Sequence, residues 1–220
     1  MKGFANYAVG YDNIDVREAT KRGIPISNIP GVLTDATAEM AWALLFAISR
    51  RVVASDTFMR SGQWKGWGPL QFIGGDITGA TLGLVGAGRI GTAMAMKSRG
   101  FDMKVLYADT IRNEKLEQEF QRMKKTAYLI NTSRGPILNE VELVQALKTD
   151  EIAGAALDVY EDEPLMAEGL KDLPNVIVTP HTASATKSSR GGMARIAATN
   201  LLAMLEGKRA PNCVNPEVYQ

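Results

Sequence analysis

The sequence contains very little cysteine and histidine. Its 220 residues include one cysteine, Cys213, and one histidine, His181. A single cysteine excludes an intrachain disulfide and is typical of a reducing compartment. We therefore expect a cytoplasmic protein, and we expect it to hold no metal ion.

Long apolar runs and a dominant charge are also missing. The longest apolar run, residues 40–48, is much too short to span a bilayer. Residues 1–7 lack the apolar core of a signal peptide. The formal net charge of +1 creates no broad field, so we expect neither nucleic acid nor a membrane as a partner. With 45% hydrophobic and 22% charged residues, the composition is that of an ordinary globular protein.

Residues 1–33 read as one strand-helix-strand unit. The pattern predicts a short strand over 3–9, a helix over 14–20 capped by Asp12 or Asn13, and a second strand over 24–27. Such a unit cannot bury its own apolar faces. We therefore expect these faces to be exposed unless another subunit covers them.

A helix is predicted next, over residues 34–55. Its apolar residues cover most of its circumference, which indicates burial on several sides as a connector or a subunit interface. This helix makes a homodimer the expected assembly. Residues 61–76 contain five glycines and read as a long surface loop anchored by Trp64 and Trp67.

From residue 78 onward, strands and helices alternate. The predicted strands are 81–86, 103–107, 127–131, 152–159 and 176–179, and the predicted helices are 89–99, 112–124, 139–148 and 186–206. This alternation predicts an α/β fold, a Rossmann-like doubly wound parallel sheet covered on both faces.

A glycine-rich loop follows the first of these strands. Gly86, Gly88 and Gly91 form a GxGxxG pattern, with Arg89 and Ile90 inside it. The first glycine permits a tight turn, the second lets the backbone approach a pyrophosphate, and the third lets the helix pack close to the strand. The pattern predicts a dinucleotide at the helix N-terminus, although a glycine-rich turn without a ligand would give the same letters.

An acid at the end of the next strand bears on the choice of cofactor. Asp109 lies 18 residues past Gly91, where a carboxylate accepts hydrogen bonds from ribose hydroxyls and repels a 2′-phosphate. We therefore expect NAD rather than NADP, a preference that the nearby Arg112 weakens.

Reactive side chains follow the last three predicted strands. Arg134 follows strand 127–131, and His181 follows strand 176–179. Asp158 lies at the end of strand 152–159, and Glu163 follows it. Open α/β sheets bind ligands at this edge. Each residue alone also has a structural reading, since a lone histidine, a turn arginine and a strand-capping Asp158 are all common.

Together these motifs resemble the D-2-hydroxyacid dehydrogenases. The resemblance is carried by residues 129–135, 156–164 and 179–181, and upstream by 9–15 and 28–34. Residues 64–68, Trp-Lys-Gly-Trp-Gly, resemble the glyoxylate/hydroxypyruvate reductase branch. Phosphoglycerate dehydrogenases are the nearest alternative substrate class.

The resemblance implies a role for each matching residue. His181 is the expected general acid for the substrate carbonyl oxygen, Glu163 hydrogen-bonds its imidazole, and Arg134 binds the substrate carboxylate and polarises the keto oxygen. The backbone N–H groups of Val9 and Gly10 are expected to hold the same carboxylate. The expected cofactor contacts are those of Asp158, Thr34, Thr132 and Ser133.

Two departures from the family accompany this resemblance. Only the end of a flavodoxin-like substrate domain is recognisable, in residues 1–33, followed by an NAD-binding domain over 34–206 and a tail over 207–220. A segment with the third Rossmann strand is missing near residues 116–121. We expect the remaining strands to form one sheet in the order 2-1-4-5-6.

The alternatives to an active reductase are a catalytically impaired dinucleotide-binding fragment and an interaction partner of a full-length dehydrogenase.

Overall fold

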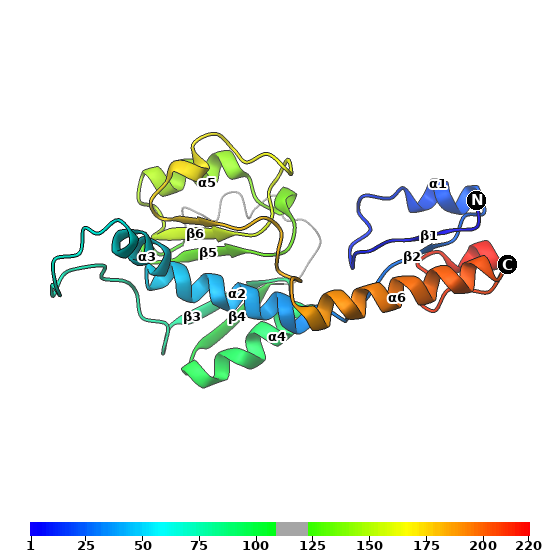
Figure 1. Cartoon of the computed structure of the whole chain (residues 1–220), viewed down its shortest axis with the longest axis horizontal. Coiled ribbons are helices and arrows are strands. Elements are labelled where there is room, and N and C mark those ends of the chain that lie inside the picture. The colour runs from blue at the N-terminus through cyan, green and yellow to red at the C-terminus, as the bar shows by residue number, and fades with distance from the viewer. Residues whose placement is uncertain (109–122) are drawn as a thin grey trace. The chain divides into compact units, whose positions relative to one another are not determined.

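The chain divides into two packing units in a computed structural model that describes residues 1–108 and 123–220 (Figure 1). Unit 1 comprises Met1–Ala36 and Ser184–Gln220, and unit 2 comprises Thr37–Ala183. These packing boundaries differ from the expected domain boundaries, because residues 184–206 pack with unit 1. Which residues make up each functional domain stays a prediction.

Unit 1 is built on a small parallel sheet. Strands β1 (Phe4–Ala5) and β2 (Ile26–Ser27) pair in parallel, and α1 (Val16–Lys21) lies between them in the chain. The predicted helix cap at Asp12 or Asn13 is wrong. The cap is Asp15, whose side chain accepts a hydrogen bond from Glu18 N, so the helix begins later than expected.

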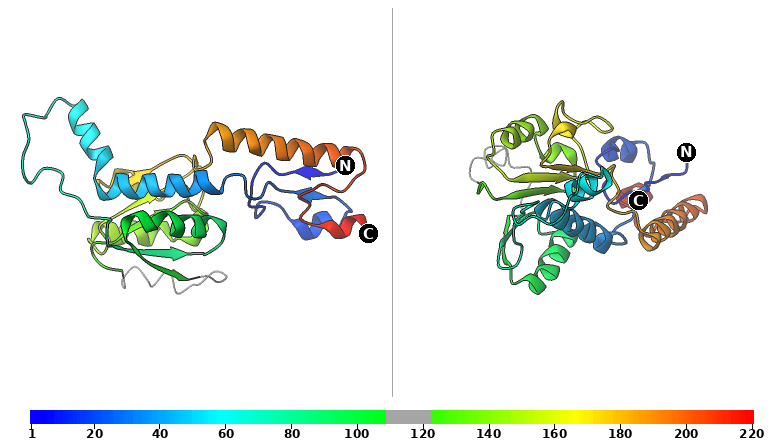
Figure 2. Two further views of the ribbon diagram at one scale, coloured as in Figure 1. Left: turned by 90° about the horizontal axis from the view of Figure 1, so that it is seen from below. Right: turned by 60° about the vertical axis from the view of Figure 1, so that its left-hand side comes forward.

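The C-terminal part of the chain covers this sheet. Helix α6 (Lys187–Leu205) runs beside β1 (Figure 2), and Val214 N donates to Ile26 O at 2.8 Å. Ile26 and Ile29 are fully buried. The expectation that another subunit must cover these strands is therefore wrong for β2, which the returning chain buries, whereas Phe4 of β1 stays exposed as expected. A short 3-10 helix, η6 (Pro216–Tyr219), ends the unit.

The described residues of unit 2 form five parallel strands in two sheets. Strands β3 (Thr81–Val85) and β4 (Lys104–Ala108) form one sheet, and β5 (Tyr128–Asn131), β6 (Gly154–Leu157) and β7 (Val176–Val178) form the other in that order. The predicted α/β class is confirmed. The expected single ladder is not, because no hydrogen bond pairs β3 with β5 in the described residues.

Side chains, rather than a backbone ladder, connect the two sheets. Leu84 of β3 and Ile130 of β5 pack in one cluster around Trp42 of α2 (Thr34–Ser49). On another face of α2, Leu44 and Ile48 pack with Ala156 of β6. The prediction that this helix is buried on several sides is confirmed.

The helix predicted over 34–55 is wrong in its extent. Arg51 has a left-handed backbone, φ 53°, and a separate helix α3 (Val52–Arg60) follows. The carbonyl of Ser49 accepts a hydrogen bond from Gly75 N at 2.9 Å, and Gly74 packs so closely that a Cβ would overlap that carbonyl. The returning loop thus occupies the end of α2 and stops it.

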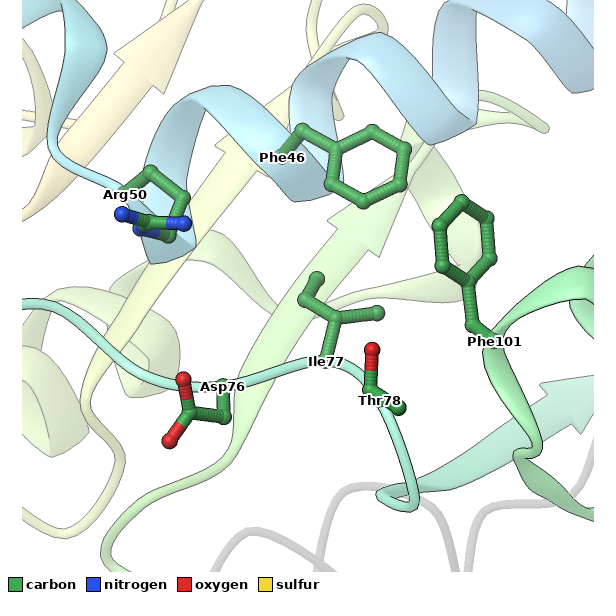
Figure 3. A pocket seen from close by; sticks show the side chains of 6 residues that line it. All are labelled: Phe46, Arg50, Asp76, Ile77, Thr78 and Phe101. Atoms are coloured by element: carbon green, nitrogen blue, oxygen red, sulfur yellow. The ribbon is translucent and has the colours of Figure 1, made fainter.

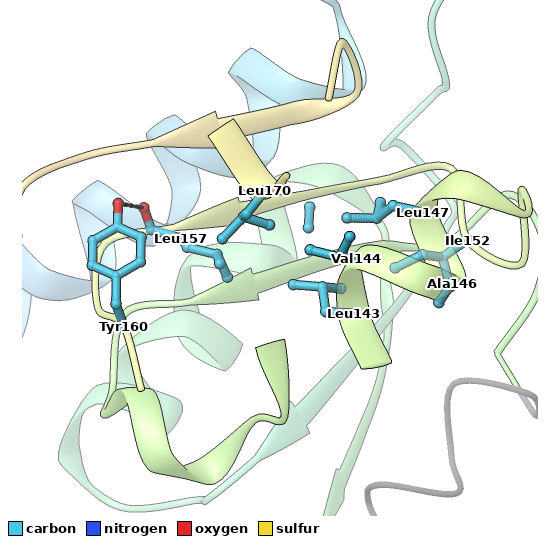
Figure 4. Packing of buried hydrophobic residues seen from close by; sticks show 9 residues of the cluster. Leu143, Val144, Ala146, Leu147, Ile152, Leu157, Tyr160 and Leu170 are labelled. Carbon is cyan, nitrogen blue, oxygen red and sulfur yellow. Dashed lines mark hydrogen bonds between the residues drawn. The ribbon is translucent and has the colours of Figure 1, made fainter. Parts of the chain in front are cut away.

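The remaining helices flank the strands. They are α4 (Arg89–Lys97), η1 (Ser98–Phe101), η4 (Gly135–Ile137), α5 (Glu140–Lys148) and η5 (Leu170–Asp172). Leu143 of α5, Leu157 of β6 and Leu170 of η5 are fully buried in one cluster (Figure 4). The predicted helix over 112–124 lies almost wholly outside the described residues.

The loop after α3 is irregular, as predicted, but its tryptophans do not anchor it. Trp67 is 84% exposed and Leu70 is 80% exposed. Trp64 is also exposed. The predicted anchoring is therefore wrong, because both tryptophan side chains are exposed. No helix in the described part of the chain is long and apolar enough to cross a membrane.

Leu157→Ala is expected to lower the free energy of unfolding by about 3 kcal/mol, because it leaves a cavity in the cluster between α5 and the three-stranded sheet. Urea denaturation followed by circular dichroism measures this. Val141→Ala is the matched control on α5, since Val141 is 70% exposed. Equal effects of the two substitutions would contradict this assignment of the core.

Candidate active site

The glycine-rich loop lies between β3 and α4. Gly86 has φ 95°, a left-handed conformation that favours glycine, and its N–H donates to Ala108 O at 2.7 Å. A Cβ on Gly91 would overlap Gly86 O, so only glycine lets α4 approach the loop this closely. The structure thus gives Gly86 and Gly91 the geometric roles predicted for them.

The loop has the features that a pyrophosphate needs. The N–H groups of Arg89, Ile90 and Gly91 lie in the first turn of α4, where a helix has no acceptors of its own for them. The helix dipole favours negative charge at the same end. Apart from its neighbours in the chain, no atom of the described residues lies within 4 Å of the position that a Cβ on Gly88 would take, which leaves room for a ligand beside this backbone. Asp109 and Arg112 lie outside the described residues.

The end of β5 forms a tight turn around Asn131. The side chain of Asn131, 5% exposed, accepts from Ser133 N at 3.0 Å and donates to Arg134 O at 3.1 Å. Arg134 Nη1 donates to Ser133 O at 2.7 Å. Gly135 packs so closely against the next loop that a Cβ would overlap Tyr160 O. Arg134, Thr132 and Ser133 therefore lie at the carboxyl edge of the three-stranded sheet.

Asp158 joins the end of β6 to the segment after β7. It is fully buried, and its carboxylate accepts from Thr179 Oγ1 at 2.6 Å, from Thr182 N at 2.8 Å and from Ala183 N at 2.7 Å. A buried carboxylate needs such donors to compensate for lost hydration. Sequence reasoning assigned Asp158 to the cofactor and missed these internal partners.

The segment that Asp158 holds carries His181. His181 Nδ1 lies 3.0 Å from Glu163 Oε2, and Glu163 Oε1 accepts from Tyr160 N at 3.2 Å. The backbone of His181 has φ 52°, a left-handed conformation that residues other than glycine adopt rarely. Both side chains of the pair are partly exposed. Of the predicted residues, Glu163 and His181 are thus brought into direct contact.

Tyr160 links the two segments that carry this pair. It is 8% exposed, and its hydroxyl donates to Thr179 O at 2.8 Å. Burial raises the pKa of Tyr160 to about 12, so the hydroxyl remains a donor at neutral pH. Sequence reasoning missed this residue, because its contact joins two loops that are distant in the chain.

A pocket of about 330 Å³ adjoins the pair. Its lining residues are Tyr160, Glu163, Pro164, Met166, Val178, Thr179, Pro180 and His181. The walls are mainly apolar, which weakens competition from water for the histidine. Arg134 is not among these lining residues.

A second pocket, of about 360 Å³, lies at the amino end of β3, away from the glycine-rich loop at its carboxyl end (Figure 3). Phe46, Phe101 and Ile77 are its apolar lining residues, and Arg50 and Asp76 are the charged ones. No residue predicted from the sequence lines it.

Three predicted residues belong to unit 1. The carbonyl groups of Val9 and Gly10 accept from Asn28 and Asn6 side chains, both at 2.8 Å. Within the described residues, no acceptor is assigned to the N–H of Val9 or Gly10. Thr34 begins α2, and its N–H donates to Gly31 O at 3.3 Å.

A known family matches most of unit 2. The profile of the D-isomer specific 2-hydroxyacid dehydrogenase, NAD binding domain, matches residues 42–119 and 116–183. The glyoxylate reductase of Thermococcus litoralis is 45% identical over 258 residues, which cover 99% of this chain and 78% of that enzyme.

Solved structures agree with this match. A Thermus thermophilus protein superposes with a TM-score of 0.90 and 39% identity, covering 97% of this chain and 79% of that one. The NADPH-dependent glyoxylate/hydroxypyruvate reductase of Sinorhizobium meliloti gives 0.86 and 32%, covering 98% and 79%. The fold shared with these proteins is the expected Rossmann-like one.

The same comparison bears on the expected internal deletion. The 258 aligned positions exceed the 220 residues of this chain, so the Thermococcus enzyme has residues that this chain lacks. The two profile matches meet at residues 116–119. The alignment length shows that residues are missing from this chain, and the two profile matches support a deletion near residues 116–121.

Gly88→Ala is expected to weaken NADH binding by about tenfold or more while leaving the fold intact, because the added methyl group enters the space reserved for the pyrophosphate. Fluorescence titration with NADH measures the affinity. Gly83→Ala is the control, since a Cβ there also meets no atom within 4 Å but lies inside β3. Unchanged binding by the Gly88 variant would contradict the assignment of this loop.

Proposed function

Because the chain belongs to the D-isomer specific 2-hydroxyacid dehydrogenases, which are NAD(P)-dependent oxidoreductases, we propose that it reduces a short 2-keto acid, glyoxylate or hydroxypyruvate. The observation that carries the proposal is the contact of 3.0 Å between His181 Nδ1 and Glu163 Oε2 beside an apolar pocket. The bound nicotinamide supplies the hydride when it is reduced. The chain has to orient the substrate and supply a proton.

His181 is the proposed proton donor. With Nδ1 directed at the Glu163 carboxylate, Nε2 is left for the substrate carbonyl oxygen. Glu163 is itself oriented by the N–H of Tyr160, so the ring is held in one orientation. In the opposite direction, His181 accepts the hydroxyl proton.

Arg134 is the proposed partner of the substrate carboxylate. A guanidinium binds a carboxylate in a bidentate manner and stabilises negative charge that develops on the keto oxygen. Its position at the end of β5, next to the strand that leads to Glu163, supports this role. The roles of Val9, Gly10, Thr34, Thr132 and Ser133 stay predictions, as does the cofactor contact of Asp158.

Similarity to named relatives favours the glyoxylate and hydroxypyruvate class over phosphoglycerate. The Thermococcus relative is named a glyoxylate reductase, and the Sinorhizobium relative is named a glyoxylate/hydroxypyruvate reductase. We therefore propose a keto acid with a short, uncharged substituent.

Of the two dinucleotides NAD and NADP, NAD is the proposed cofactor. Asp109 motivates this choice, because its carboxylate suits free ribose hydroxyls. The Sinorhizobium relative is NADPH-dependent, so the family includes both preferences. A comparison of kcat/KM for NADH and NADPH tests the choice.

We further propose a cytoplasmic location, which the single cysteine favours.

The alternative of a dinucleotide-binding fragment without catalysis is not favoured. A fragment that only binds a dinucleotide does not require the contact between Glu163 and His181. It also does not require the left-handed backbone conformation in which His181 is held. Backbone strain of this kind persists when surrounding structure enforces it and is concentrated at functional sites.

A homodimer is the proposed assembly. The segment from α3 through the following loop displays several large apolar side chains, namely Val52, Val53, Met59, Trp64, Trp67, Leu70 and Ile73. Such a concentration on one segment is typical of a protein interface. A second copy of this chain is the proposed partner of this exposed surface, since α2 itself packs within unit 2.

His181→Ala is expected to lower kcat for glyoxylate reduction by about 100- to 10,000-fold, because the general acid is lost. NADH oxidation in the presence of glyoxylate or hydroxypyruvate measures it. NADH affinity should remain within about twofold of the wild type, since the ring does not contact the phosphate loop. Wild-type protein that binds NADH but oxidises none would overturn the proposed reaction.

Trp67→Ser together with Leu70→Ser is expected to shift the protein from dimer to monomer in analytical ultracentrifugation, because two side chains that are 84% and 80% exposed lose their apolar surface. Val141→Ser, on an exposed position of α5, is the control. A wild-type monomer, or a dimer that survives the double substitution, would contradict this interface.

A further inference from the structure

One buried carboxylate in unit 2 has no part in the proposed chemistry. Glu140 is 2% exposed and is the first residue of α5. Its Oε1 accepts from Glu161 N at 2.6 Å, and its Oε2 accepts from Ala167 N at 2.8 Å. Both oxygens are therefore used, and both partners are backbone N–H groups of the loop after β6.

The two donors lie on either side of Glu163. Residues 161–167 form a closed turn, in which Leu165 N donates to Asp162 O at 2.8 Å. A second hydrogen bond joins the same two residues in the opposite direction, because Glu161 Oε2 accepts from Glu140 N at 3.3 Å. The loop that carries Glu163 is thus attached at both ends to one side chain of the neighbouring helix.

The place of Glu140 explains why a carboxylate serves here. The first turn of α5 carries the positive end of the helix dipole, which favours a negative group. Charge-assisted hydrogen bonds to backbone N–H groups are stronger than neutral ones. A buried charge without these partners would be costly, so the loop and the carboxylate stabilise each other.

We propose that Glu140 is a positioning residue for the Glu163–His181 pair. It fixes the 161–167 loop, so that Glu163 Oε2 stays within 3.0 Å of His181 Nδ1. The inference rests on the proposed function, because that function gives the Glu163–His181 pair its role in proton transfer. Glu140 contacts neither the pocket beside His181 nor the glycine-rich loop.

The test uses the fact that His181 is the only histidine in the sequence. In a neutral imidazole one nitrogen carries the proton and the other accepts, and a carboxylate beside Nδ1 favours the proton on Nδ1. Nitrogen-15 NMR of the ring therefore reports the Glu163 contact without enzyme turnover. The other ionisable groups around the pair, Tyr160, Asp158 and Glu161, are left unchanged.

The variant is Glu140→Gln, which retains the shape but cannot accept from both N–H groups at once through its one amide oxygen. We expect the Nδ1–H tautomer to lose its majority and kcat for glyoxylate reduction to fall about ten- to hundredfold, with NADH affinity unchanged. Glu142→Gln, an exposed acid in the same first turn, is the control and should match the wild type. Glu140→Asp, with a shorter reach, replaces the Gln variant if that one does not fold.

Glu163→Ala separates the two proposals. If it removes the Nδ1–H majority but Glu140→Gln leaves both the tautomer and kcat at wild-type values, the positioning role of Glu140 is overturned while the pair stands. If Glu163→Ala changes neither the tautomer nor kcat, the proposed pair itself fails. A Glu140 variant that lowers only the melting temperature would show a merely structural side chain.

Discussion

The site depends most on the buried carboxylate of Asp158. It receives the Thr179 hydroxyl and the N–H groups of Thr182 and Ala183, so it connects the end of one strand to the segment beyond the next. Parallel pairing of β6 and β7 brings the two segments to one edge, and its last hydrogen bond runs from Thr179 N to Leu157 O at 2.9 Å. Beyond that point, the carboxylate determines where His181 lies.

A second buried carboxylate holds the other half of the pair. Burying a charge is unfavourable unless donors replace the lost water, and here backbone N–H groups do so. Because these donors belong to the loops that carry Glu163 and His181, the requirement to satisfy each charge also orders each loop. Tyr160 adds a neutral link between them through Thr179 O. The exposed pair is thereby supported by a buried polar frame.

Helix α2 has a comparable role for the whole of unit 2. Two sheets without a shared ladder pack on different faces of it, through Trp42 on one side and Ile48 on the other. Contacts within unit 2 therefore account for the apolar residues on several faces of α2. Surface that remains apolar and exposed is found on α3 and the following loop, where a partner subunit is proposed.

Local sequence determined much of this protein: the order of strands and helices, the glycine-rich loop, and the strand ends at which Arg134, Glu163 and His181 occur. These features follow from periodicity, from glycine geometry and from the common edge of parallel strands. Tertiary structure decided the rest. Contacts between distant residues set the helix break at Arg51, the separation into two sheets and the burial of β2 by the returning C-terminal chain. The hydrogen bonds of Asp158, Tyr160 and Glu140 likewise join residues far apart in the chain. A one-dimensional pattern does not encode which distant donor meets which acceptor.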